Sequence, residues 1–294
     1  MNKHLHRFRR ILFRAISDDV LNTSKAAAYS GMLMLFPGLL LLTTILALAP
    51  DSSHVRVELR NALEQFLPAD TMDLVQAYFQ TQHVRPVQVL FSAGGLTVLA
   101  GLGMILTLME GFRRAYRIQG DEDWGFWGRR ITALLLIPSC LIPMGFATLL
   151  VVFGHSIEIW MIENAGHELR HVVVFFWRLM RWILAMGTST TVLALIYHFG
   201  TRRREHWTRI LPGAFFATAI WFPLTLTFGW YVTRVADYSI LYGSLGTGIA
   251  TMVWLYLTFI AVLAGAEYNA VSWRERSESN FQHTQVEAQD SRQV

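Results

Sequence analysis

The chain has 294 residues, of which 53% are hydrophobic and 16% charged, and it carries a formal net charge of +4. Soluble domains contain about 25% charged residues, so this composition excludes an ordinary soluble domain and indicates a protein whose solvent is lipid. The single cysteine, Cys140, excludes an intrachain disulfide.

The first 25 residues are predicted to form an amphipathic segment on the cytoplasmic membrane surface. Leu5, Phe8 and Leu12 share one helical face, while Arg7 and Arg14 lie elsewhere. This is the pattern of a helix that lies on an anionic leaflet. We therefore predict that residues 1–25 form a separate segment that precedes the membrane domain.

Six windows between residues 26 and 271 are long and apolar enough to cross the hydrocarbon core, which takes about 20 apolar residues in a helix. They predict an all-α integral membrane protein with six transmembrane helices. The polar segment 272–294 is predicted to be a disordered cytoplasmic tail. The predicted spans are 26–49, 87–110, 131–154, 182–199, 209–233 and 245–271.

The basic residues orient these spans. With the N-terminus inside, 18 of the 25 Lys and Arg residues fall on inner segments and 7 on outer ones, and cytoplasmic loops are enriched in such residues. We therefore expect a multi-pass protein of the bacterial inner membrane with both termini cytoplasmic. The same rule accounts for the run from Arg202 to Arg204, so no nucleic-acid partner is expected.

Two outer segments are too long and too regular for simple loops. In residues 51–86 and 155–181, apolar side chains recur at helical spacing, which is typical of a helix with one apolar face. We therefore expect short amphipathic helices on the outer side of the bundle.

The second outer segment contains the sequence HELRH, which matches the zinc-binding motif H-E-x-x-H. His167 and His171 would be the metal ligands, Glu168 would be the general base, and His155 lies nearby. The extended motif requires a glycine where this chain has Val174. We therefore favour no metal site and keep a membrane metallopeptidase as a minor alternative.

Four prolines lie well inside predicted spans, away from the first turn. Proline removes a backbone hydrogen bond, and neighbouring helices or a cavity must satisfy the groups that it frees in a membrane. We therefore expect kinked helices at Pro37, Pro138, Pro143 and Pro223.

The sixth span carries small or polar residues at four-residue intervals, namely Ala261, Gly265 and Asn269. Residues of this size and spacing let helix backbones approach closely in lipid. We expect this span to lie in the interior of the bundle.

Two carboxylates, Glu110 and Glu267, stand near the cytoplasmic ends of predicted spans. Ionisable groups at membrane depth are costly, and they usually have a partner and a function. Arg113, Arg114, Lys25 and Arg209 should lie at similar depth. Both an interfacial ion-pair network and a proton or cation site remain open.

Four stretches resemble the YihY/BrkB family of bacterial inner-membrane proteins, once labelled ribonuclease BN. They are AAAYSGMLMLFPGLLLL (26–42), EGFRRAYRI (110–118), PGAFFATAIWF (212–222) and DYSILYGSLGTGIATMVWLYLTFIAVLAGAEYNAV (237–271), in family order. The resemblance implies a six-helix membrane fold with cytoplasmic termini. It implies little chemistry: members have been linked to serum resistance and proposed as transporters, including of envelope lipids.

Together these observations favour a non-enzymatic transporter or lipid flippase of the cell envelope, with membrane lipids as partners, no cofactor and an unknown substrate. A homo-oligomer is left open. The alternative is a structural or scaffold membrane protein in which the same residues only pack. The predicted pathway or polar network comprises Tyr29, Glu110, Tyr242, Ser244, Tyr256, Glu267 and Asn269.

Overall fold

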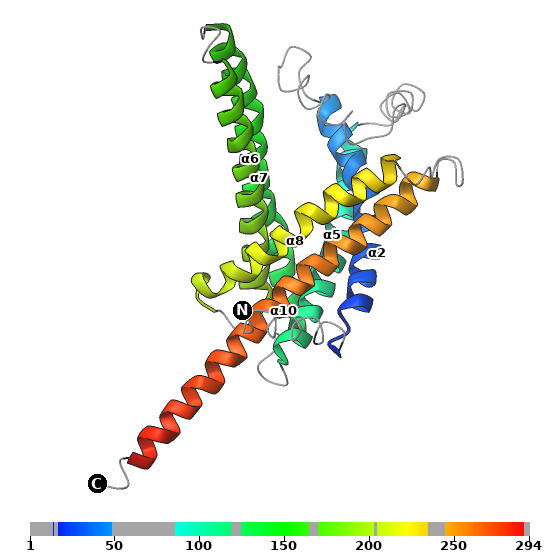
Figure 1. The fold of residues 1–294 in the computed structure, drawn as a ribbon. Helices are drawn as coiled ribbons and strands as arrows, with labels where there is room; N and C mark the ends of the chain where they lie inside the picture. Colours follow the sequence, from blue (N-terminus) through cyan, green and yellow to red (C-terminus); the bar gives the residue numbers. More distant parts are fainter. Residues whose placement is uncertain are drawn as a thin grey trace.

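The computed structural model describes residues 14, 17–48, 86–118, 125–164, 170–202, 205–234 and 245–290. Within these ranges all regular structure is helical (Figure 1), which confirms the all-α fold class. The helices are α2 (Val20–Leu48), α5 (Pro86–Tyr116), α6 (Phe126–Asn164), α7 (Arg170–Gly200), α8 (Trp207–Arg234) and α10 (Leu245–Asp290).

Each predicted span coincides with one of these helices. In the part of the chain that the structure describes, α2, α5, α7, α8 and α10 are long and apolar enough to cross a membrane. The third predicted span lies within α6. The count of six spans therefore stays a prediction.

The outward surface of the helices is apolar. Phe91 on α5, Ile142 on α6 and Phe175 on α7 are 75%, 72% and 69% exposed. Soluble monomers rarely expose large contiguous apolar patches, whereas lipid tails solvate them without cost. The exposed side chains therefore mark the lipid-facing surface.

Hydroxyl side chains inside the helices bond to their own backbone. Thr97 Oγ1 donates to the Ala93 carbonyl at 2.7 Å, and Thr218 Oγ1 donates to the Ala214 carbonyl at 2.9 Å. Each acceptor lies one turn back along the helix. Such bonds satisfy polar groups where water is scarce.

The four prolines named above lie inside continuous helices, Pro37 in α2, Pro138 and Pro143 in α6, and Pro223 in α8. Pro212 is a fifth, in the second turn of α8. Because the helices continue past each proline, a kink at these positions stays a prediction.

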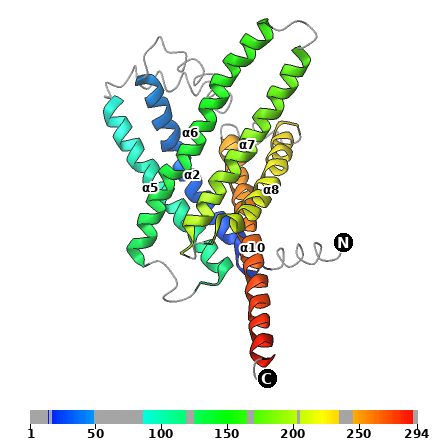
Figure 2. The same cartoon turned by 90° about the vertical axis from the view of Figure 1, so that its left-hand side faces the viewer.

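The buried core lies at one end of the bundle, which we call the packed end. There α2 and α8 begin, α5 and α7 end, and the main cluster includes Leu108, Phe112, Tyr197, Ile210 and Leu263. The helices pack as the pairs α2–α5, α6–α7 and α8–α10, and α10 also contacts α2 and α5. Away from the packed end, the α6–α7 pair diverges from the other four helices (Figures 1 and 2).

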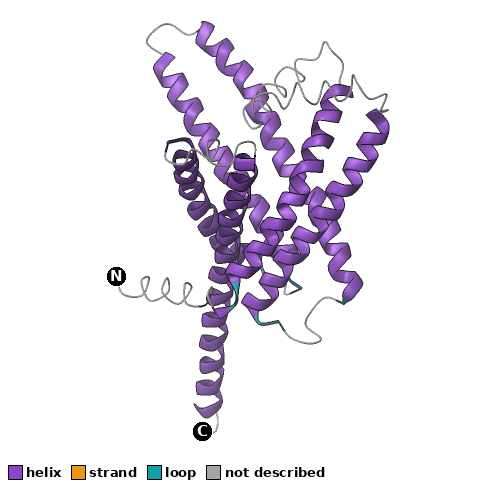
Figure 3. Ribbon diagram, turned by 90° about the vertical axis from the view of Figure 1, so that its right-hand side faces the viewer, coloured by secondary structure: helices purple, strands orange, loops and turns teal. Residues whose placement is uncertain are grey.

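The C-terminal tail differs from the sequence prediction. Helix α10 continues to Asp290 and projects beyond the packed end (Figure 3), so the disorder predicted for 272–294 is wrong up to that residue. This segment contains no glycine or proline before Asp290 and is rich in Glu, Gln and Arg. Extending an existing helix with helix-forming residues avoids the cost of nucleation, so a polar composition did not indicate disorder here.

Several sequence predictions fall outside the described residues. The second outer segment, 155–181, is partly occupied by the neighbouring long helices: α6 extends into it to Asn164, and α7 begins within it at Arg170. The residues outside the description include 1–13 of the N-terminal segment, 51–85 of the first outer segment, 167–169 of HELRH, Tyr242 and Ser244.

Helix α5 ends in a cap that places an arginine in the left-handed region. Arg117 has φ 51°. The Ile118 N–H donates to the Arg113 carbonyl and the Arg117 N–H donates to the Arg114 carbonyl, both at 3.0 Å. This is the Schellman arrangement, in which glycine is the residue of lowest cost at the left-handed position.

Arg117→Gly is therefore expected to raise the free energy of unfolding by about 1 kcal/mol, because it relieves the left-handed strain. Arg117→Ala removes the same charge and leaves the strain, so it is the matched control. Melting temperatures of the two purified variants in detergent measure the difference. Equal melting temperatures would mean that charge, and not backbone strain, dominates at this cap.

Candidate functional site

Helices α8 and α10 approach closely because both carry glycine at their contact. A Cβ placed on Gly265 of α10 would lie 2.6 Å from the Ala217 Cβ and 2.6 Å from the Gly213 carbonyl oxygen, which real side chains do not allow. A Cβ placed on Gly213 of α8 would overlap the amide of Asn269. Small residues at such contacts bring helix backbones together in lipid. These glycines fix which face of α10 meets α8.

Asn269 fastens the same contact. Its Oδ1 accepts from the Gly213 N–H at 3.0 Å, and its Nδ2 donates to the Ile210 carbonyl at 3.0 Å. Both backbone groups belong to the turn of α8 that contains Pro212. The oxygen and the nitrogen of the Asn269 side-chain amide thus both hold α10 against α8.

Glu267 is the buried carboxylate of the site. It is 0% exposed, and neither of its carboxylate oxygens accepts a hydrogen bond from a described donor, although the Asp18 carboxyl group lies within hydrogen-bonding reach and can share a proton with it. The charged side chains that act on it are Asp18, Arg274 and Arg14. Burying a carboxyl group without hydrogen bonds costs free energy in either protonation state, and far more when the group is ionised. The fold therefore retains a destabilising group at the centre of the packed end.

Asp18 and Asp19 form the turn that precedes α2. Asp19 has φ 61°, a left-handed conformation that aspartate adopts more readily than most residues. Its Oδ1 accepts from Asn22 Nδ2 at 2.6 Å, and its Oδ2 accepts from Arg114 Nη1 of α5 at 3.0 Å. Because Asp18 acts on Glu267 while Asp19 binds Arg114, this turn connects two charged regions.

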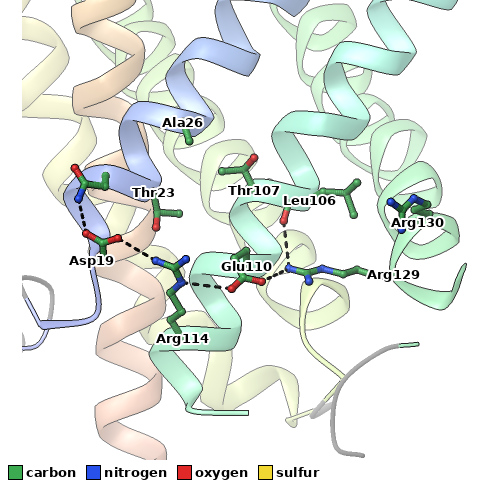
Figure 4. Close-up of a pocket in the computed structure, with 10 residues that line it drawn as sticks. Asp19, Thr23, Ala26, Leu106, Thr107, Glu110, Arg114, Arg129 and Arg130 are labelled. Atoms are coloured by element: carbon green, nitrogen blue, oxygen red, sulfur yellow. Dashed lines mark hydrogen bonds and ion pairs between the residues drawn. The ribbon is translucent and has the colours of Figure 1, made fainter. Parts of the chain in front are cut away.

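The second charged region surrounds Glu110 on α5 (Figure 4). Glu110 Oε1 accepts from Arg113 Nη2 at 2.7 Å, and its Oε2 accepts from Arg129 Nη2 of α6 at 2.8 Å. Arg114 Nε lies 3.4 Å from Oε1. Arg113 and Arg114 are partners expected from the sequence, whereas Arg129 is not; Lys25 instead donates to the Asn22 side chain at 3.3 Å.

A pocket of about 520 Å³ adjoins Glu110. It lies between the beginning of α2, the end of α5 and the beginning of α6. Asp19, Arg114, Glu110 and Arg129 point toward one another, whereas Arg130 lies apart from them beside α6 (Figure 4). The polar lining of the pocket includes Asp19, Asn22, Glu110, Arg114, Arg129 and Arg130.

The predicted pathway residues do not gather in one place. Glu110 borders the pocket, whereas Glu267 and Asn269 lie in the buried core. Tyr29 is 58% exposed on α2, and Tyr256 is half-buried against the main cluster. Glu110 and the Glu267–Asn269 pair therefore lie in two separate polar regions, and the two tyrosines belong to neither.

Sequence reasoning missed the residues that connect these regions. Asp18 and Asp19 were assigned to the N-terminal segment, and Arg129, Arg130 and Arg274 were counted only as inner positive charges. One signal was available for the turn, because aspartate directly before an apolar helical run is a preferred N-terminal cap. No sequence signal pairs Asp18 with Glu267 across the intervening chain.

Of the predicted metal ligands, His167 lies outside the described residues, and His155 and His171 fall on helical backbone of α6 and α7. Among the residues that the structure does describe, no group of three or more His, Cys, Asp or Glu side chains could hold a metal ion.

The apolar outer surface and the long helices define a polytopic, all-helical membrane protein. The chain belongs to the Virulence factor BrkB family, whose model matches residues 11–290. This agrees with the resemblance found in the sequence.

Individual relatives match most of the chain. The ribonuclease-like protein YfkH of Bacillus subtilis is 31% identical over 253 residues, which cover 84% of this chain and 89% of the relative. A UPF0761 membrane protein of Pseudoalteromonas atlantica is 25% identical over 93% of this chain and 88% of its own length. Another, of Alteromonas mediterranea, is 26% identical over 87% and 83%. No solved structure matches the chain.

Gly265→Ala is expected to lower the free energy of unfolding by about 1–3 kcal/mol, because the added methyl overlaps α8. Gly187→Ala on α7 is the matched control, since a Cβ there meets nothing within 4 Å. Thermal unfolding of both variants in detergent gives the comparison. The account of the α8–α10 contact fails if the two substitutions have the same effect.

Proposed function

We propose that this protein is a non-enzymatic transporter of the bacterial inner membrane, with cytoplasmic termini, and that its substrate is a membrane lipid or another envelope component. The observation that supports the proposal is the buried carboxylate of Glu267, which accepts no hydrogen bond from a described donor. Ionisable groups at membrane depth are costly and by default mark function. Packing does not require a carboxylate there, since Asn269 and the glycines already hold α10 against α8.

The position of Glu267 suits a switch at the packed end. Helix α10 contacts α2, α5 and α8, so a change at its buried centre reaches three neighbours. Asp18 supplies a second carboxyl group, and Arg14 and Arg274 supply opposing cations. Gain or loss of one proton in this group of four would change which pairing is favoured, and would bias the bundle between a packed and a separated arrangement.

The divergence of the α6–α7 pair supports the same mechanism. Transporters expose a site to alternate sides by moving groups of helices against one another. A bundle closed at its packed end and diverging at the other (Figure 2) is what one such arrangement would look like. Separation of the charged group at Glu267 would open the packed end and give the other arrangement.

A scaffold is the alternative, and it uses the same packing without transport. Purified protein in lipid vesicles separates the two functions, because a scaffold moves neither labelled lipid nor ions. The family and relatives named above support a membrane protein and leave this choice to experiment.

Glu267→Gln is expected to abolish transport while expression and folding remain intact, because the amide keeps the size of the side chain and removes its proton exchange. The assay follows labelled phospholipid and ion flux in vesicles of phosphatidylethanolamine and phosphatidylglycerol. Glu278→Gln, on the exposed part of α10, is the matched control and should transport normally.

Two results would count against the proposal. Normal transport by Glu267→Gln would remove this carboxylate from the mechanism. Absence of lipid and ion movement with the wild-type protein, under conditions in which it is folded, would favour the scaffold.

A further inference from the structure

The pocket beside Glu110 is a polar feature that the transport proposal does not use. It encloses about 520 Å³ at the packed end, between α2, α5 and α6 (Figure 4). Three arginines line it, Arg114, Arg129 and Arg130, against two carboxylates, Asp19 and Glu110. Three positive and two negative charges leave the lining with an excess of one positive charge.

Arg130 supplies that excess. Arg114 and Arg129 both contact Glu110, and Arg114 also binds Asp19. Arg130 forms no ion pair with a described residue: its guanidinium lies 3.5 Å from the centre of the Phe126 ring, and its Nη1 donates to the Phe126 carbonyl at 3.1 Å. An aromatic ring and a carbonyl position a guanidinium without neutralising it.

The beginning of α6 is compatible with an anion. Phe126 is the first residue of this helix, and its first turn contains no acidic residue, while Asp121, Glu122 and Asp123 precede it outside the described residues. The N-terminus of a helix carries partial positive charge, so an arginine in the first turns is in an unfavourable field. A bound anion would relieve the repulsion between the helix terminus and Arg130, because helix N-termini and arginine both bind phosphate oxygens.

Apolar surface continues from the pocket along all three helices. On α2, Tyr29 and Leu33 follow the pocket residue Ala26 on the same face, and they are 58% and 51% exposed. On α5, Leu99 lies two turns from the pocket residue Leu106 and is 65% exposed. On α6, the exposed residue Leu134 lies one turn beyond Arg130. Trp127, at the start of α6, is also exposed, as aromatic residues at a membrane interface are.

We propose that this pocket binds the phosphate of an anionic membrane lipid, with Arg130 as the cation that no described carboxylate pairs and the acyl chains along the apolar faces of α2, α5 and α6. The cationic lining selects an anion, and the continuous apolar surface selects a lipid over soluble phosphate. This inference goes beyond the transport proposal, because the lipid is recognised whether or not the protein moves it.

The test uses the full-length protein in detergent, titrated with phosphatidylglycerol, with bound lipids counted by native mass spectrometry. Arg130→Gln is expected to weaken binding roughly fivefold or more, the contribution of one basic residue near an anionic lipid. Arg130→Lys keeps the charge and should retain most of the affinity. Arg234→Gln, which removes an exposed arginine at the end of α8, is the control and should bind as the wild type does.

Three results would overturn the proposal. They are unchanged affinity of a folded Arg130→Gln variant, binding of phosphatidylcholine by the wild type as tightly as phosphatidylglycerol, and displacement of the lipid by an equal concentration of inorganic phosphate. The second and third comparisons use only the wild-type protein, so they decide the matter even if the variant fails to fold.

Discussion

The packed end depends on the close contact between α8 and α10, which buries one carboxyl group, Glu267, where α10 passes its neighbours. The α8–α10 contact fixes the position of the Glu267 side chain, because Gly265 and Gly213 bring the backbones together and Asn269 fixes the register. With that face committed to α8, the residue two positions before Asn269 must project from another face of the helix. Glu267 is thereby held where neither oxygen accepts a hydrogen bond from a described donor.

The two polar regions of the packed end differ in energetic character. Glu110 has arginine partners on its own helix and on α6, so its charge is compensated and its geometry is defined. Glu267 accepts no hydrogen bond from a described donor, and buried charges of that kind destabilise a fold by several kcal/mol unless they are neutralised. The turn at Asp18 and Asp19 joins these regions, so a change at one reaches the other through the beginning of α2.

Much of the fold followed from apolar length alone, because a helix that satisfies its own backbone is the economical way to cross lipid. The glycine and asparagine pattern of the sixth span likewise predicted its interior place. Two features were not predictable from local sequence. The Asp18–Asp19 turn is important through its contacts with α5 and α10, which lie far from it in the sequence. The tail is helical because it extends an existing helix, and its polar composition gave no sign of this. The inward orientation of Glu267 was not predictable either, because it is set by the contact between α10 and α8.

The most direct test of the central claim is the melting temperature of Glu267→Gln in detergent, compared with Glu110→Gln. If Glu267 is a destabilising group retained for function, its replacement leaves the melting temperature unchanged or raises it, since a buried carboxylate without a hydrogen-bond donor is removed. Glu110→Gln should lower it, because two arginines and the α5–α6 contact lose their carboxylate. A fall of several degrees for Glu267→Gln, equal to that of Glu110→Gln, would identify Glu267 as a structural ion-pair lock and contradict the account.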